Sequence, residues 1–121
     1  MRPDERDPAH LWDMLEAAMA IARYGRGKTI DEYLRDPMFR DAVERQFILV
    51  GEAARRLTEA FRAAHPEIPW QGVIGQRNVL IHRYEEIDDR LMWERIQRDV
   101  PDLIRLLSPL IPNPPVVESE S

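Results

Sequence analysis

Residues 37–65 read PMFRDAVERQFILVGEAARRLTEAFRAAH, and this stretch decides the fold class. Apolar side chains recur along it every three or four positions, at Phe39, Val43, Phe47, Val50, Ala54, Leu57 and Phe61. That spacing is typical of a helix with one buried face. Asp36-Pro37 has the form of a helix start, and Pro66 limits further extension. We therefore predict one long helix from residue 37 to about residue 65.

The same helical spacing continues toward the N-terminus. A first helix is expected to begin with Asp7 as its N-cap and Pro8 in its first turn, and to end at Gly25, where a left-handed backbone is tolerated. Thr29-Ile-Asp-Glu32 has the pattern of a capping box, which predicts a short second helix that ends before Asp36-Pro37.

Two more helices are expected after Pro66. Pro69 marks the start of a fourth helix, whose apolar face is Trp70, Val73, Ile74, Leu80 and Ile81. Asp88 or Asp89 caps a fifth, which Pro101 bends and which buries Leu91, Ile96, Val100, Leu103 and Leu107.

The pattern as a whole predicts an all-α protein. The chain shows neither a strand-like alternation nor an internal repeat, and its 121 residues are typical of a single domain. Five helices with short connections indicate an up-and-down bundle over residues 1–108. Residues 109–121 are rich in proline, serine and acidic side chains, which predicts a flexible tail.

Composition excludes several classes of function. The chain has no cysteine, no apolar run of membrane length and no secretion signal at its start, so we expect a cytoplasmic protein. Its net charge of −5 argues against non-specific coating of DNA, and no DNA partner is expected. His10, His65 and His82 are widely separated, so neither a metal site nor a cofactor is expected.

The segment Gln76-Arg77-Asn78-Val79-Leu80-Ile81-His82-Arg83-Tyr84 carries the functional signal. At about 100° per residue, Arg77 falls within the apolar stripe, close to Tyr84. A guanidinium in that position requires an acidic group or a ligand phosphate as its partner. Asn78 and His82 share one face at the stripe edge, roughly 100–140° round the helix from Arg77.

Each of these residues also has a purely structural interpretation. Arg77 could be half of a structural ion pair, His82 a hydrogen-bonded packing residue, and Tyr84 a core aromatic with a satisfied hydroxyl. Taken singly, none of them establishes an activity.

Taken together, they resemble the signature of the HEPN superfamily, in particular of HepT-like toxins paired with MNT-type minimal nucleotidyltransferases. That signature is an arginine followed by asparagine, with histidine five positions after the arginine and tyrosine two further on. Other landmarks of the family are matched in order, over about residues 8–108, by Val50-Gly-Glu-Ala-Ala-Arg-Arg-Leu57, His65-Pro-Glu-Ile-Pro-Trp70, Ile74-Gly-Gln-Arg-Asn78 and Trp93-Glu94.

The resemblance implies a HEPN-like bundle and the toxin half of a type II-like toxin–antitoxin pair. It further implies a metal-independent endoribonuclease, in which a ribose 2′-hydroxyl attacks the adjacent phosphate. His82 would transfer the proton, Arg77 would stabilise the phosphate charge, and Asn78 would orient His82 or the phosphate. Tyr84 matches the tyrosine to which the partner nucleotidyltransferase, the antitoxin, transfers AMP.

The geometry of one helix leaves a difficulty, because Arg77 and His82 point in different directions. The resemblance implies a homodimer in which two arginines and two histidines share one cleft. Ile48 and Leu49, opposite the core stripe of the third helix, form an apolar patch suited to a partner chain, and Glu52 beside them is a candidate cleft residue.

Two other functions remain open from the sequence. One is a non-catalytic helical binding subunit of a nucleotidyltransferase complex, and the other is a purely structural dimerising bundle. The sequence does not name the RNA target.

Overall fold

The computed structural model describes residues 3–112 and 114, and over these residues the chain is helical without any strand. The helices are α1 (Asp7–Gly25), α2 (Ile30–Arg35), α3 (Pro37–Arg56), α4 (Glu59–Ala64), α5 (Trp70–His82), α6 (Asp89–Glu94) and α7 (Val100–Leu107). The all-α prediction is confirmed. None of the helices described here is long and apolar enough to cross a membrane.

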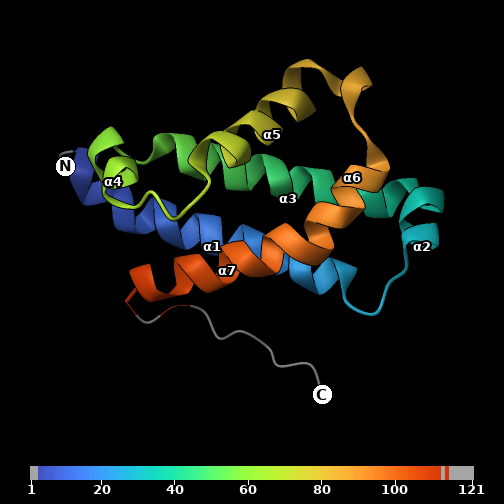
Figure 1. Ribbon diagram of the computed structural model, residues 1–121, viewed down its shortest axis with the longest axis horizontal. Coiled ribbons are helices and arrows are strands. Elements are labelled where there is room, and N and C mark those ends of the chain that lie inside the picture. The colour runs from blue at the N-terminus through green and yellow to red at the C-terminus, as the bar shows by residue number, and fades with distance from the viewer. Residues whose placement is uncertain (1–2, 113, 115–121) are drawn as a thin grey trace.

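The two long helices form the centre of the bundle (Figure 1). α1 and α3 lie side by side and make the most extensive contact in the molecule. α5 packs along α3, and α7 packs along α1 on the other side of the bundle. α3 is therefore covered from two sides, and its side chains reach both α1 and α5.

The core is built from the apolar stripes of these helices. The spacing of apolar residues correctly identified the buried faces of the first and third predicted helices. Side chains that are nearly or fully buried include Leu11, Met14, Leu15, Val43, Phe47, Val50, Leu103 and Leu107.

The predicted long third helix is interrupted at Leu57 and Thr58, so this prediction is wrong beyond Arg56. The buried carboxylate of Asp7 accepts a hydrogen bond from the Thr58 backbone N–H at 3.0 Å and another from the Thr58 hydroxyl at 2.7 Å. Thr58 Oγ1 in turn accepts from the backbone N–H of Phe61 and caps α4. Asp7 does not cap α1 as predicted, because its carboxylate is engaged with Thr58 instead.

The other predicted caps are confirmed. Thr29 and Glu32 form the reciprocal capping box at the start of α2. The Asp36 carboxylate accepts from two backbone N–H groups of α3, and Asp88 does the same at the start of α6. Local sequence therefore determines where these three helices begin.

α1 ends at Gly25 as predicted, but the left-handed residue is Gly27, with a φ of 71°. Gly25 has a different role, since a Cβ on it would lie only 2.7 Å from Cγ2 of Ile96. The glycine lets the last turn of α1 approach the residues that follow α6.

The predicted fifth helix is divided by a π-helical turn, Arg95–Asp99, which joins α6 to α7. Pro101 lies two residues after this turn, and because proline has no N–H, the regular hydrogen-bond ladder is broken there. Ile96, Val100, Leu103 and Leu107 are buried as predicted, whereas Leu91 is exposed. The prediction for Leu91 is wrong, because it lies in the first turn of α6 with its side chain in solvent.

The packed part of the chain extends past Ser108. A short 3-10 turn, Ser108–Leu110, follows α7, and Ile111 is buried against the core, although it was assigned to the flexible tail. Pro112 and Pro114 are described, and the remainder of the predicted tail lies outside the described residues.

The bond pair between Asp7 and Thr58 gives a first prediction. Asp7→Ala leaves the Thr58 N–H and hydroxyl without partners, so we expect the free energy of unfolding to fall by about 1–3 kcal/mol in urea denaturation. Asp13→Ala, an exposed position on the same helix, is the control and is expected to change it by less than about 0.5 kcal/mol. Equal stabilities of the two variants would contradict this account of the helix break.

Candidate active site

α3 and α5 approach each other closely at Gly51. A Cβ built on Gly51 would overlap Cβ of Arg77, lie 2.9 Å from its Cγ and lie 3.2 Å from the carbonyl oxygen of Val73. Only glycine fits there without moving α5. Because the two backbones approach so closely, the start of the Arg77 side chain is held directly against α3.

The Arg77 guanidinium meets the carboxylate of Glu52, the residue after Gly51. Arg77 Nε donates to Glu52 Oε1 at 2.8 Å, and Nη2 lies 2.6 Å from the same oxygen. The side chains are 14% and 22% exposed, so water has limited access to the pair. The hydrogen bond from Arg77 lowers the pKa of Glu52, which keeps this carboxylate charged at neutral pH.

Two more arginines surround the same carboxylate. Arg55 Nη1 lies 3.7 Å and Arg56 Nη2 lies 3.9 Å from Glu52 Oε2. Both of these side chains are more than half exposed. Three guanidinium groups thus share one carboxylate, which makes this surface locally positive on a chain whose net charge is −5. A local excess of arginine is what a phosphate group requires.

Asn78 is turned toward Arg77. Its Oδ1 accepts a hydrogen bond from Arg77 Nη1 at 2.8 Å, so Asn78 and Glu52 hold the guanidinium from two directions. The predicted contact of Asn78 is with His82 or a phosphate, and the contact observed within this chain is with Arg77.

His82 is the last residue of α5, and its side chain is exposed. Within the described part of the chain its ring has neither a hydrogen bond nor an ion pair. The structure therefore brings together Arg77, Asn78 and Glu52, while His82 stands apart from them on the surface.

The apolar patch predicted beside Glu52 is less exposed than expected. Ile48 and Leu49 are both half-buried, and both pack against the core. Ile81 and Tyr84, on either side of His82, are among the exposed large apolar side chains. Ile81 was expected to face the core, but it lies in the final turn of α5, where its side chain reaches solvent.

Comparison with known proteins adds the decisive observation to this geometry. The family model "Ribonuclease HepT-like" matches residues 14–110, which include every helix from α2 to α7 and most of α1. The chain belongs to the HepT-like ribonuclease family. No solved structure significantly matches the chain.

Named relatives support this membership in the HepT-like family. The chain is 37% identical over 95 residues to "Putative RNase MJ1380" of Methanocaldococcus jannaschii. These 95 residues make up 78% of this chain and 87% of the relative. The chain is 34% identical over 94 residues to "Probable ribonuclease HepT" of Thermococcus cleftensis, with 78% and 86% coverage. The similarity therefore extends over more than three quarters of this chain and of each relative.

Tyr84 of this HepT-like chain is not on the helix that carries Arg77. α5 ends at His82, and Tyr84 begins a 3-10 turn, Tyr84–Glu86. The ring is 58% exposed, so the placement of Tyr84 in the apolar stripe and its interpretation as a core aromatic are both wrong. The helical wheel failed here because it assumed that the helix continued past His82.

Glu44 is a neighbour of Tyr84 that the sequence pattern did not identify. It lies on α3 and is buried, and burial raises the pKa of its carboxyl. The charge of Glu44, together with burial, raises the pKa of the Tyr84 hydroxyl, so the phenol is protonated at neutral pH. Its sequence signal was weak, because Glu44 directly follows Val43 but falls outside the apolar stripe of this helix.

Gly51 is the second residue that sequence reasoning missed. A glycine inside a helix costs about 1 kcal/mol relative to alanine, so its presence in the middle of α3 was itself a signal of a close approach.

No group of three or more His, Cys, Asp or Glu side chains suited to a metal occurs among the residues the structure describes.

The close approach at Gly51 gives a second prediction. Gly51→Ala places a methyl group against Arg77, so we expect a loss of about 1–3 kcal/mol in the free energy of unfolding, from overpacking. Gly75→Ala on α5 is the matched control, because nothing lies within 4 Å of a Cβ at that position. The free energy of unfolding of the control is expected to rise by about 0.5–1 kcal/mol, because alanine has the higher helix propensity.

Both changes in the free energy of unfolding are to be measured by urea denaturation at neutral pH. If Gly51→Ala is as stable as Gly75→Ala, the packing of Arg77 on α3 is not as tight as described.

Proposed function

We propose that this HepT-like chain is a metal-independent endoribonuclease and the toxin of a toxin–antitoxin pair. The observation that carries the proposal is the Arg77 guanidinium, which Glu52 and Asn78 hold in place within a cluster of arginines. A fixed fork of donors on a positive surface suits the extra charge of a phosphorane-like transition state. Membership in a ribonuclease family supports RNA as the substrate.

The proposed chemistry assigns one role to each motif residue. His82 takes the proton from the ribose 2′-hydroxyl or gives one to the leaving 5′-oxygen, since imidazole exchanges protons near neutral pH. Arg77 stabilises the phosphate charge. Asn78 positions the Arg77 guanidinium, and Glu52 orients it from the other side.

A single protomer does not join these groups, and we propose that two protomers do. His82 is exposed and has no partner among the described residues, while Arg77 is held against α3. The exposed side chains of Ile81 and Tyr84 beside His82 form an apolar surface suited to contact with a second copy. A symmetric homodimer would provide two histidines, one as the base and one as the acid.

Control of the proposed toxin is assigned to Tyr84. We propose that a cognate MNT-type nucleotidyltransferase, the antitoxin, transfers AMP to the Tyr84 hydroxyl. The exposure of Tyr84 supports access by a modifying enzyme. The added nucleotide would bring a negative charge to a surface that serves an RNA phosphate, so modification and cleavage would exclude each other.

A second candidate function is a non-catalytic binding subunit of a nucleotidyltransferase complex. The pairing of Arg77 with Glu52 inside one chain favours it, because a structural ion pair alone explains that contact. The two candidates differ in what His82 does: the ribonuclease needs its imidazole, whereas a binding subunit does not need a proton-transfer group there.

The first test of the proposal is His82→Ala. His82 is exposed and unpartnered, so its removal is expected to leave the free energy of unfolding within about 0.5 kcal/mol of the wild type. Cleavage of RNA in EDTA is expected to fall by at least about 100-fold, the usual contribution of a general acid or base. His10→Ala on α1 is the control for loss of a histidine elsewhere.

Retained cleavage in His82→Ala would exclude the assignment. If the folded wild type cuts no RNA at all, the non-catalytic binding subunit becomes the better account.

The second test concerns the shared site. Arg77→Ala and His82→Ala chains are each expected to be inactive as homodimers. When they are mixed and allowed to exchange subunits, the shared cleft of a heterodimer regains one intact Arg77 and one intact His82. We expect partial recovery of cleavage, together with a dimer mass in light scattering. An active wild-type monomer would rule out this arrangement.

The third test concerns Tyr84 and uses intact-mass measurement after co-expression with an MNT-type nucleotidyltransferase. The wild type is expected to gain the mass of one or more AMP groups, and Tyr84→Phe is expected to gain none. Tyr24→Phe, an exposed tyrosine on α1, is the matched control and should still be modified. Neutralisation of an unmodified wild type would instead indicate inhibition by complex formation.

A further inference from the structure

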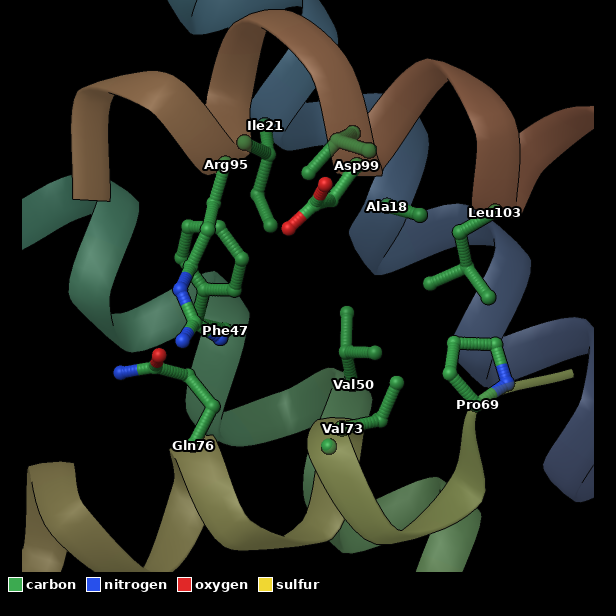
Figure 2. Close-up of a pocket in the computed structure, with 12 residues that line it drawn as sticks. Ala18, Ile21, Phe47, Val50, Pro69, Val73, Gln76, Arg95, Asp99 and Leu103 are labelled. Carbon is green, nitrogen blue, oxygen red and sulfur yellow. The ribbon is translucent and has the colours of Figure 1, made fainter. Parts of the chain in front are cut away.

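A cavity lies between α1, α3, α5 and α7 (Figure 2). Neither Arg77 nor Glu52 lines it. Its volume is about 260 Å³. Most of its wall is apolar, formed by Ala18, Ile21, Phe47, Val50, Val73 and Leu103. Neither the cleavage chemistry nor the modification of Tyr84 makes use of it.

Three polar side chains also line the cavity. Gln76 comes from α5, directly before Arg77, while Arg95 and Asp99 are the first and last residues of the π-helical turn. Figure 2 shows Arg95 and Gln76 together on the side of Phe47, with Asp99 pointing into the space between the helices and Leu103 and Pro69 on the opposite side. The polar groups therefore gather toward one end.

These polar groups have free hydrogen-bonding capacity. The Nε atom of Arg95 is buried without a partner. Within the described chain, neither Arg95 nor Asp99 forms an ion pair, although Arg98 on the same segment pairs with Glu94 at 3.1 Å. A buried donor without a partner is costly, so this end of the cavity suits a ligand that supplies an acceptor.

The combination of charges restricts the ligand class. An aliphatic molecule would fill the apolar part but leave Arg95 unsatisfied. A simple anion would satisfy Arg95 but face the Asp99 carboxylate. A neutral, flat heterocycle with donors and acceptors on one edge satisfies both, and its faces suit the apolar wall. π-helical turns frequently occur at functional sites, which agrees with the position of Arg95 and Asp99 on one.

We propose that this cavity binds a nucleobase, and guanine best. Arg95 would donate to O6, Asp99 would accept from N1–H and the 2-amino group, and the Phe47 ring would lie against the base. A volume of about 260 Å³ suits a base better than a whole nucleotide. Asp99 is exposed, so the sugar and phosphate would leave the cavity at its end.

The base could belong to an RNA strand or to a free nucleotide, and both present the same chemistry to this cavity. If it belongs to RNA, the cavity selects the cleavage position, and that part of the inference rests on the proposed ribonuclease function. Binding of a nucleoside does not depend on cleavage and is measured separately.

The experiment is calorimetric titration of the folded, full-length chain with guanosine, adenosine, cytidine and uridine, and with octanoate as an aliphatic anion. Guanosine is expected to bind at least tenfold more tightly than uridine. Arg95→Met and Asp99→Asn are each expected to weaken guanosine binding at least tenfold. Arg98→Met, which removes the arginine paired with Glu94, should leave it unchanged.

A pair of glycines on α5 provides a test that leaves the polar groups intact. Gly72 lines the cavity and Gly75 does not, and nothing lies within 4 Å of a Cβ at either position. Gly72→Leu is expected to fill the cavity and abolish guanosine binding, while Gly75→Leu retains it. Both variants cost the same change in helix propensity, so loss of folding would affect the two alike.

Three results would overturn the proposal: no guanosine binding by the wild type, guanosine binding unaffected by Asp99→Asn and Gly72→Leu, or octanoate binding that depends on Arg95. If the chain binds guanosine but cuts no RNA, the ribonuclease proposal is refuted and the cavity is still a guanine-binding site. Mapping of cleavage positions identifies the source of the base. A preference for guanine that Asp99→Asn removes indicates RNA, and an unchanged pattern indicates a free nucleotide.

Discussion

The contact between Gly51 and Arg77 is the constraint on which the site depends. A side chain at Gly51 would push α5 away from α3, and the Arg77 guanidinium would then lose its position beside Glu52. Because both Glu52 and Asn78 hold Arg77, few rotamers remain open to it, and the charge is positioned before any ligand arrives. Gly51 lowers the helix propensity of α3, but it allows the close packing that places a positive charge at the surface.

The same helix serves two different surfaces. Arg77 faces α3 and the arginine cluster, while Gln76, one residue earlier, faces the cavity toward α1 and α7. Neighbouring residues on a helix are separated by about 100°, so one element can carry both the proposed cleavage site and the proposed recognition site. The arginines beside Glu52 gather positive charge at one place on a chain whose net charge is −5.

Sequence patterns predicted the parts of the fold that local interactions determine. The apolar stripes identified the core of α1 and α3, and the caps at Thr29, Asp36 and Asp88 are present as predicted. The break after Arg56 was missed, because it depends on a bond between Thr58 and Asp7, far apart in sequence. The helix end at His82 has no glycine or proline to mark it, and for that reason the wheel position of Tyr84 beside Arg77 and the alternative of a core aromatic are wrong, while an accessible hydroxyl was expected.

The sequence predicted only part of the candidate site. The position of Arg77 in an apolar stripe predicted either an acidic group or a ligand phosphate as its partner, and within this chain the partner is Glu52. The roles of Arg77, Asn78, His82 and Tyr84 stay predictions, since they depend on groups from outside one chain.

Cleavage of an RNA that carries a single 2′-deoxy nucleotide at the mapped cleavage position tests the central claim most directly. The account predicts that the all-ribose strand is cut in EDTA to give a 2′,3′-cyclic phosphate, and that the 2′-deoxy strand is not cut at that position, because the attacking hydroxyl is missing. Cleavage of both strands at the same position and rate would contradict the account.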